Sequence, residues 1–209
     1  MCELEKCDGF CIPRSILPSP GNINNMQFEL IGCGDGSSVA CGAAVYLRWH
    51  DADEQNIEIK FLGAKGKINP IKGTTVPRSE LCGSLLVSKL VHSVESVLKN
   101  TDINMYYKEK LLFSDSTTVL SWLKSAAIKY KPFVKHKIME CQELQPISSW
   151  NFISGKNNTA ADLISKGCKF KDLDAVVNGP DMLHQRRDAW PVAPSEENKK
   201  NLILRNVLA

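Results

Sequence analysis

Three consecutive β-strand patterns between residues 26 and 68 limit the folds that this chain can adopt. They lie at about residues 28–33, 41–49 and 57–61, and the third alternates isoleucine and phenylalanine with polar residues. Such alternation of apolar and polar residues is typical of half-buried strands. Only short polar segments separate the three patterns, so the sequence predicts an antiparallel meander.

The elements that follow predict helices packed on the faces of a mixed sheet. Pro77 suits the first turn of a helix, and an apolar stripe follows it as far as Leu98. The later expected elements are a strand at 111–113, a helix from Ser116, a helix after Pro132, a strand around 150–152 and a helix at 159–166 that stops at Gly167. This order of strands and helices predicts an α/β fold.

The chain has 209 residues, 43% of them hydrophobic, and a net charge of +3, which is typical of a soluble globular protein. We divide it into a lead-in segment at 1–25, a domain at 26–168 and a polar C-terminal extension at 169–209. The longest uninterrupted run of small and apolar residues, 39–47, is too short for a membrane span. We therefore expect no transmembrane helix.

Eight cysteines are scattered through the chain without a Cys-x-x-Cys pair, which favours an intracellular protein, cytoplasmic or nuclear. Cys2, Cys7 and Cys11 lack a fourth ligand nearby, so we do not expect zinc there. Four others lie in apolar runs and are expected to be buried thiols: Cys33, Cys41, Cys82 and Cys141.

Four carboxylates stand at the ends of expected elements. Asp35 follows the first strand, Glu80 lies in the first turn of the long helix, Asp115 ends the buried strand, and Asp162 lies in the first turn of the late helix. Each alone has an ordinary explanation as a helix-dipole, turn or cap residue. If the strands that carry Asp35 and Asp115 are neighbours, however, all four side chains meet. Four like charges need cations, and paired magnesium ions would suit phosphodiester hydrolysis.

Five ordered segments surround these carboxylates: residues 34–48 with Gly-Asp-Gly-Ser-Ser, 77–82 with Pro-Arg-Ser-Glu-Leu-Cys, 114–120 with Ser-Asp-Ser-Thr-Thr-Val-Leu, 155–163 with Gly-Lys-Asn-Asn-Thr-Ala-Ala-Asp-Leu, and 165–167 with Ser-Lys-Gly. In this order they resemble the ribonuclease H region of BEL/Pao retrotransposon polyproteins. With flanks that also resemble the family, the likeness covers roughly residues 12–192. Two positions depart from the family pattern: Gly36 replaces an alanine, and one residue is inserted before Asp162. The insertion either lengthens the loop or turns Asp162 by about 100° around its helix.

The resemblance implies a ribonuclease H-like fold with a mixed five-stranded sheet, and hydrolysis of the RNA strand of an RNA–DNA hybrid by two Mg²⁺ ions, for which Mn²⁺ can substitute. Asp35, Glu80, Asp115 and Asp162 would be both the catalytic residues and the metal ligands. A reverse transcriptase module would be a further partner. Cellular ribonucleases H also use a histidine before the last aspartate, and none lies between residues 150 and 162. Product release or proton shuttling would therefore be slower, or would be served by Lys156.

Contacts to nucleic acid are expected from two segments. Gly36 and Ser37 would face the sugars of the hybrid, and a lysine-rich segment that includes Lys129, Lys131 and Lys135 would follow its phosphates. The alternative for these lysines is an ordinary solvated helix face. The aromatic residues in and near this segment, Trp122, Phe133 and Trp150, are expected in the core rather than as base-stacking platforms.

Three other functions compete with an active nuclease. The first is a nucleic-acid-binding relic of the Pol polyprotein that has lost useful catalysis. The second is a Pao-type aspartic peptidase, but its Asp-Thr/Ser-Gly signature is absent, because Asp35-Gly36-Ser37 has the reverse order. The third is an integrase, which shares the fold. The residue 35 positions after Glu80 is Asp115, however, so the order of the acidic residues is wrong for an integrase.

Overall fold

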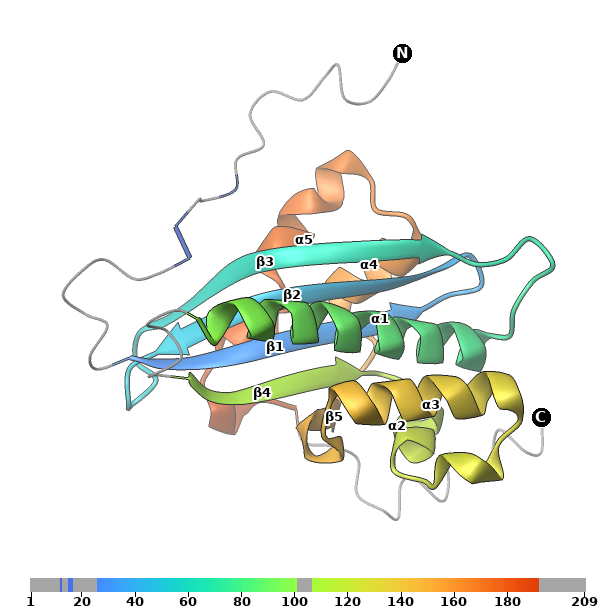
Figure 1. Ribbon diagram of the computed structural model, residues 1–209. Helices are drawn as coiled ribbons and strands as arrows, with labels where there is room; N and C mark the ends of the chain where they lie inside the picture. Colours follow the sequence, from blue (N-terminus) through green and yellow to red (C-terminus); the bar gives the residue numbers. More distant parts are fainter. Residues whose placement is uncertain (1–11, 13–14, 17–25, 101–106, 192–209) are drawn as a thin grey trace.

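Five strands form one mixed sheet in the order β3-β2-β1-β4-β5. The computed structural model describes residues 12, 15–16, 26–100 and 107–191 (Figure 1). The strands are β1 (Gln27–Gly36), β2 (Ala40–His50), β3 (Ile57–Ile68), β4 (Tyr107–Ser114) and β5 (Trp150–Phe152). β1, β2 and β3 pair antiparallel, whereas β4 runs parallel to β1 and β5 parallel to β4. The predicted meander and the predicted mixed five-stranded sheet are both confirmed.

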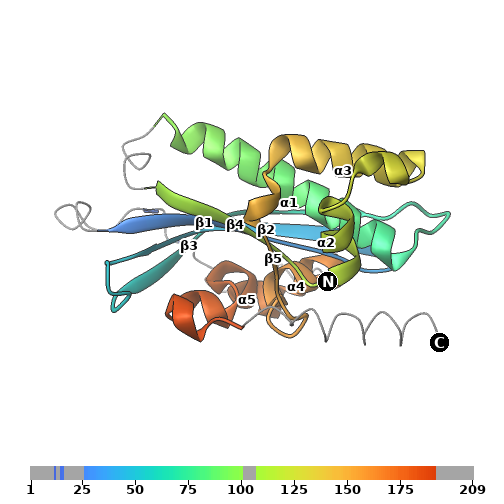
Figure 2. The ribbon, with the colours of Figure 1, turned by 90° about the horizontal axis from the view of Figure 1, so that it is seen from below.

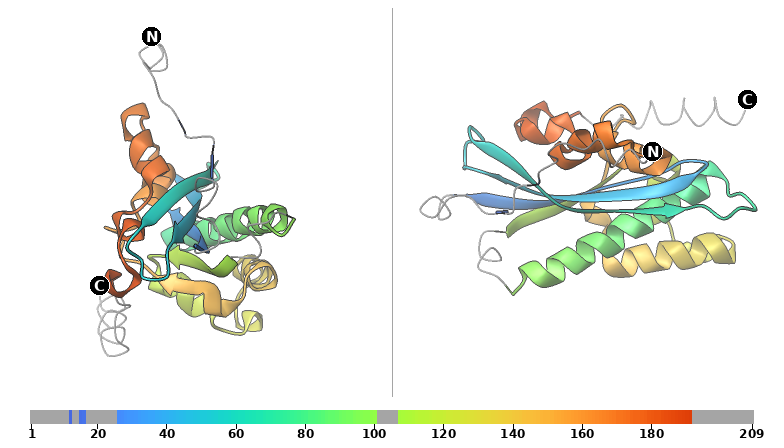
Figure 3. Two further views of the ribbon diagram at one scale, coloured as in Figure 1. Left: turned by 90° about the vertical axis from the view of Figure 1, so that its left-hand side faces the viewer. Right: turned by 90° about the horizontal axis from the view of Figure 1, so that it is seen from above.

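Helices cover both faces of this sheet, so the protein has three layers (Figures 2 and 3). On one face lies α1 (Val76–Leu98), with α3 (Pro132–Leu144) beside it and α2 (Thr117–Leu123) after β4. On the other face lie α4 (Thr159–Lys166) and α5 (Leu173–Asn178). Each helix expected from the sequence is present, and Pro77 stands in the first turn of α1 as predicted.

Alternating residues of β1 supply two hydrophobic cores, one on each face of the sheet. Phe28 and Leu30 pack with residues of α1, α2 and α3, whereas Ile31 and Cys33 pack with residues of α4 and of the segment that follows it. Among the cysteines in apolar runs, Cys33, Cys41 and Cys141 are buried as expected, but Cys82 is only half-buried. Cys2, Cys7 and Cys11 lie outside the described residues.

Helix α1 is long and apolar enough, by length and composition alone, to be a candidate membrane span. Our search for uninterrupted apolar runs missed this candidate, because serine and glycine residues interrupt the apolar stripe of α1. An 18-residue window of this helix has a mean hydropathy of 1.3, and 44% of that window is buried. The buried side of α1 packs on β1 and β2, as a core helix does.

The described part of the C-terminal extension packs on the same face of the sheet as α4. Val176 of α5 and Met182 and Leu183 of the short helix η7 (Asp181–His184) are buried there. Tyr46 of β2 donates a hydrogen bond of 2.6 Å from its hydroxyl to the carbonyl of Val176. The extension is therefore attached to the sheet by both apolar and polar contacts. The lead-in segment falls almost entirely outside the described residues, so our domain boundaries remain a prediction.

Candidate functional site

The parallel pairing of β1 and β4 brings Asp35 and Asp115 to the same edge of the sheet. The last paired residues are Cys33 and Phe113, and each aspartate lies two positions beyond its member of that pair. Asp35 belongs to β1 itself, since the strand continues to Gly36, whereas the sequence had placed Asp35 after the strand. Its side chain is buried, and Asp115 follows the last residue of β4.

Two glycines allow α1 to approach this edge of β1 closely enough to bring Glu80 beside Asp35. A Cβ atom on Gly36 would lie 2.1 Å from the carbonyl carbon of Ser79, and one on Gly83 would lie 2.1 Å from the carbonyl oxygen of Asp35. Any side chain at either position would therefore push the helix from the strand. Because α1 begins at Val76, Glu80 lies just beyond its first turn, not within it as predicted.

Hydroxyl groups hold two of the carboxylates. Ser116, whose side chain caps α2 by accepting from the backbone N–H of Val119, donates to Oε2 of Glu80 at 2.7 Å. Ser165 of α4 donates to Oδ2 of Asp35 at 2.5 Å. Sequence reasoning had treated Ser116 only as the start of a helix and had missed Ser165. The position of Ser165 three residues after Asp162 was the available signal, because residues three apart share a face of a helix.

Helix α4 carries Asp162 to the edge of the site. The side chain of Asn158, at the N-cap of this helix, makes no capping bond; it donates instead to the carbonyl of Gly34 at 3.2 Å and so ties the helix to β1. Asp162 lies in the first turn, as predicted, and Lys166 one turn later forms an ion pair with it at 2.6 Å. Sequence reasoning had not identified Lys166 as a neighbour of the carboxylates.

The four carboxylates lie close enough to influence one another electrostatically. Burial raises the pKa of Asp115 to about 7, and the negative charges of Asp35, Glu80 and Asp162 contribute to the increase. Burial also raises the pKa of Glu80, where the hydrogen bond from Ser116 opposes the shift and the charge of Asp35 adds to it. Buried carboxyls among like charges favour the protonated form unless a cation neutralises them.

The cluster has the donor chemistry of a site for hard divalent cations. Its ligands are carboxylate oxygens, which Mg²⁺ prefers, and Oδ1 of Asp115 is buried without a hydrogen-bond partner among the described residues. Gly155 has no side chain, which leaves room beside Asp115. A Cβ atom at this position would lie only 3.1 Å from Oδ2 of Asp115. The residues therefore fit magnesium chemically. A second group of side chains that could hold a metal ion, Glu29, His50 and Glu54, lies elsewhere in the molecule.

The residues proposed for sugar contacts have structural roles in the hairpin between β1 and β2. Gly36 is buried against α1. The hydroxyl of Ser37 lies 2.6 Å from the carbonyl of Ser165 and accepts from the backbone N–H groups of Val39 and Ala40. Both residues thus help to join β1, β2 and α4, and any contact of theirs with nucleic acid remains a prediction.

The lysine-rich segment forms an exposed basic surface on α3 and the turn before it. Lys129 and Lys131 are exposed and Lys135 is half-buried. Phe133 is 43% exposed, so the expectation that it belongs to the core is wrong. Two cations lie near its ring, with Arg78 at 5.3 Å and Lys137 at 5.1 Å from the centroid.

A cleft of about 460 Å³ beside Phe133 is lined mainly by basic charged residues. Lys67, Arg78, Lys89 and Lys137 line it, between the ends of β2 and β3 and the two helices α1 and α3, together with Glu140, which pairs with Lys89. Arg78 lies two residues before Glu80 on α1. Sequence reasoning had not linked Arg78 or Lys67 to the lysine segment, because only the fold brings them together.

Several solved structures of ribonucleases H are similar to this chain at low sequence identity. The N-terminal RNase H domain of a Mycobacterium tuberculosis protein is 16% identical, covering 72% of this chain and 96% of that chain, with a TM-score of 0.42. RNase H1 from Halobacterium salinarum is 15% identical, covering 71% and 98%, with a TM-score of 0.38. An RNase H1 from compost, solved in complex with an RNA/DNA hybrid, is 13% identical, covering 70% and 99%, with a TM-score of 0.39.

Sequence comparison identifies the family. No curated protein matches the chain. A family model does match, over residues 1–116, and its description is a Pao retrotransposon-like RNaseH-like domain. The matched segment includes β1 to β4 and three of the four clustered carboxylates, Asp35, Glu80 and Asp115. This match covers more than half of the chain, which therefore belongs to the Pao retrotransposon-like RNaseH-like family.

Proposed function

We propose that this protein is a metal-dependent endonuclease that hydrolyses the RNA strand of RNA–DNA hybrids. The observation that carries the proposal is the cluster of Asp35, Glu80, Asp115 and Asp162 at one edge of the sheet, in which burial and mutual repulsion raise the pKa of Asp115 to about 7. A purely structural role would not require four acids that destabilise one another. Membership of an RNaseH-like family supports the same reaction class.

The four carboxylates would hold two magnesium ions, with Asp35 and Asp115 shared between them and Glu80 and Asp162 completing one each. Bound magnesium would supply an activated water and neutralise charge on the phosphate in the transition state. The hydroxyls of Ser165 and Ser116 hold Asp35 and Glu80 by one oxygen each. They leave the other oxygen of each carboxylate available for a ligand.

Lys166 would influence how easily the cluster accepts cations. Its ammonium group pairs with Asp162, and this hydrogen bond, with smaller contributions from Asp35 and Asp115, raises the pKa of Lys166. The side chain is 64% exposed and can swing into solvent when a metal takes its place. Lys156, in the turn before α4, is also exposed and remains the second basic group proposed near the site.

The hybrid would lie across the face that carries the cleft beside Phe133, with its phosphates on the lysine-rich segment. Neutralising backbone phosphates supplies most non-specific affinity for nucleic acid. In the polyprotein context the domain would act beside a reverse transcriptase module. The RNaseH-like fold does not favour the aspartic-peptidase alternative.

Cleavage of a labelled RNA–DNA hybrid, measured beside duplex DNA of the same sequence, tests this function. We expect the RNA strand alone to be cut, only with a divalent cation, and not by the Asp115→Asn variant. A folded wild-type protein that binds the hybrid without cutting it in magnesium or manganese would instead indicate the nucleic-acid-binding relic.

A further inference from the structure

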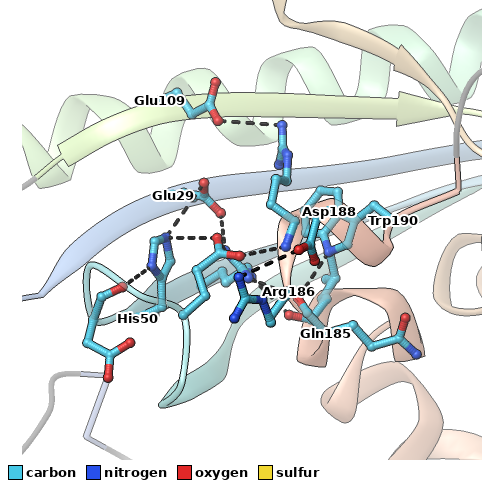
Figure 4. Close-up of polar contacts among 12 residues, drawn as sticks. Glu29, His50, Glu109, Gln185, Arg186, Asp188 and Trp190 are labelled. Atoms are coloured by element: carbon cyan, nitrogen blue, oxygen red, sulfur yellow. Dashed lines mark hydrogen bonds and ion pairs between the residues drawn. The ribbon is translucent and has the colours of Figure 1, made fainter.

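A second cluster of ionisable side chains lies at the other end of β1 from the carboxylates. Glu29 stands on β1 and His50 ends β2 (Figure 4). Glu54 lies in the turn between β2 and β3. One ligand atom from each of these residues lies within 4.8 Å of the other two. Glu29 precedes Asp35 on the same strand by roughly 20 Å. The two clusters are therefore separate sites.

Each side chain in this cluster has one polar atom fixed by a contact outside the cluster. Nδ1 of His50 lies 2.6 Å from the carbonyl oxygen of Asp51. Oε2 of Glu29 accepts from Arg48 at 2.6 Å, and Oε2 of Glu54 accepts from the backbone N–H of Arg187 at 2.6 Å. Oε1 of Glu29 and Nε2 of His50 are left facing the other residues of the cluster, whereas Oε1 of Glu54 also accepts from Nη1 of Arg48 at 3.3 Å.

Oε1 of Glu29 and Oε1 of Glu54 both face Nε2 of His50, but neither forms a hydrogen bond with it. Nε2 of His50 lies 3.8 Å from Oε1 of Glu29 and 3.6 Å from Oε1 of Glu54. The side chain of His50 is 1% exposed, and its Nε2 has no hydrogen-bond partner among the described residues. A buried nitrogen facing two carboxylate oxygens points to a cation between them.

The hydrogen bond at Nδ1 determines what Nε2 can offer. A carbonyl oxygen only accepts, so Nδ1 must carry a proton, and the neutral ring then presents a lone pair at Nε2. Histidine ligands of metals usually have this arrangement, with the other ring nitrogen donating to a carbonyl or carboxylate. The hydrogen bond of Arg48 to the outer oxygen of Glu29 is the same kind of support for a ligating carboxylate.

The spacing of these atoms is close to that of a tetrahedral zinc site. Nitrogen and oxygen ligands bind zinc at about 2.0–2.1 Å, which places two ligand atoms about 3.3–3.4 Å apart. The observed separations of 3.6 and 3.8 Å need only small movements to reach that value. One nitrogen with two oxygens favours zinc over magnesium, which prefers oxygen ligands alone.

The surroundings would leave a fourth position open to solvent. A cavity of about 500 Å³ borders the cluster and is lined by His50, Glu54, Lys108 and Arg186, among others. Arg48 supplies one positive charge, with Nη1 3.3 Å from Oε1 of Glu54, so the two glutamates and Arg48 together carry a net charge of −1. That charge would favour binding of a divalent cation, whereas Lys108 and Arg186 on the cavity wall oppose it.

We propose that Glu29, His50 and Glu54 bind one zinc ion, with the fourth position facing the cavity. The ion would connect β1, β2 and the turn before β3. Through Glu54 and Arg187, it would also strengthen the attachment of the C-terminal extension to the sheet. This site is independent of the proposed nuclease function, since it shares no residue with the carboxylate cluster.

Zinc titration of the full chain, freed of metal and kept reduced, tests the proposal. The wild type, His50→Gln and the matched control His184→Gln are compared by calorimetry; His184 is an exposed histidine outside the cluster. We expect one zinc ion per chain whose affinity falls at least about tenfold in His50→Gln and is unchanged in His184→Gln. Asp115→Asn should also retain it, which separates this site from the carboxylate cluster.

Cobalt substitution distinguishes this site from the cysteines. The His50-dependent ion should give the absorption bands of nitrogen and oxygen ligation, without a thiolate charge-transfer band. If His50→Gln fails to fold, Glu54→Gln provides the same comparison from the turn. Equal zinc affinity in the wild type and the cluster variants, or a cobalt spectrum with thiolate bands alone, would overturn the proposal.

Discussion

Changing Asp115 to asparagine should stabilise the metal-free protein at alkaline pH, although it removes a proposed metal ligand. The pKa of Asp115 rises from its ordinary value of 3.8 to about 7 on folding. Between these values the folded state keeps a proton that the unfolded chain has released, so the stability of the wild type falls as pH rises from about 4 to about 7. Asparagine stays neutral and escapes this loss.

The size of the effect follows from the shift in the pKa. About three pKa units correspond to about 4 kcal/mol, and solvent screening at this half-buried side chain reduces the expected value to roughly 2 kcal/mol. In chelator at pH 8, Asp115→Asn should therefore be about 2 kcal/mol more stable than the wild type. At pH 4 the two proteins should be nearly equal in stability.

Urea unfolding in chelator at pH 4, 6 and 8 measures this difference. Asp162→Asn is the matched control, because Asp162 pairs with Lys166 and is the last of the three charges that raise the pKa of Asp115. This control should keep most of the pH dependence of the wild type. Magnesium at pH 8 should stabilise the wild type but not Asp115→Asn. Parallel stability curves for the wild type and Asp115→Asn would refute the argument that burial and the neighbouring carboxylates raise the pKa of Asp115.

Two further predictions concern the approach of α1 and the basic surface. Gly36→Ala should destabilise the protein by about 3 kcal/mol, because its Cβ atom would meet backbone atoms of α1, whereas Gly63→Ala, with open space around it, should have little effect in the same unfolding assay. Replacing Lys129, Lys131 and Lys135 with alanine should flatten the salt dependence of hybrid binding by about 0.9 in the double-logarithmic slope for each phosphate that is no longer neutralised. An unchanged slope would assign these lysines to an ordinary solvated face.

The meander, the long helix and the carboxylate positions could be predicted because each depends on local sequence patterns. Strand alternation locates β1 to β3, and the parallel pairing of β1 with β4 then brings Asp35 and Asp115 together. The register of a strand pair is not visible locally, so Glu29 opposite Arg48 could not be predicted. The cluster around His50 was missed for this reason.

Contacts between distant segments were also beyond prediction. Ser165 touches Asp35 from 130 positions away along the chain, and Arg48 donates to the carbonyl of Leu183 from 135 positions away. A polar composition suggested only an extension after residue 168, because the few residues that attach it to the sheet, such as Leu183, do not form a periodic pattern. These contacts depend on the completed fold.

Metal-dependent cleavage of an RNA–DNA hybrid tests the central proposal most directly. The wild type and the amide variants Asp35→Asn, Glu80→Gln and Asp115→Asn are incubated with the hybrid in magnesium, manganese, calcium or chelator. We predict that the wild type cuts the RNA strand in millimolar magnesium and in manganese, that calcium does not support cleavage, and that the folded amide variants are inactive. Cleavage that persists in chelator, or full activity of folded Asp115→Asn, would contradict the account.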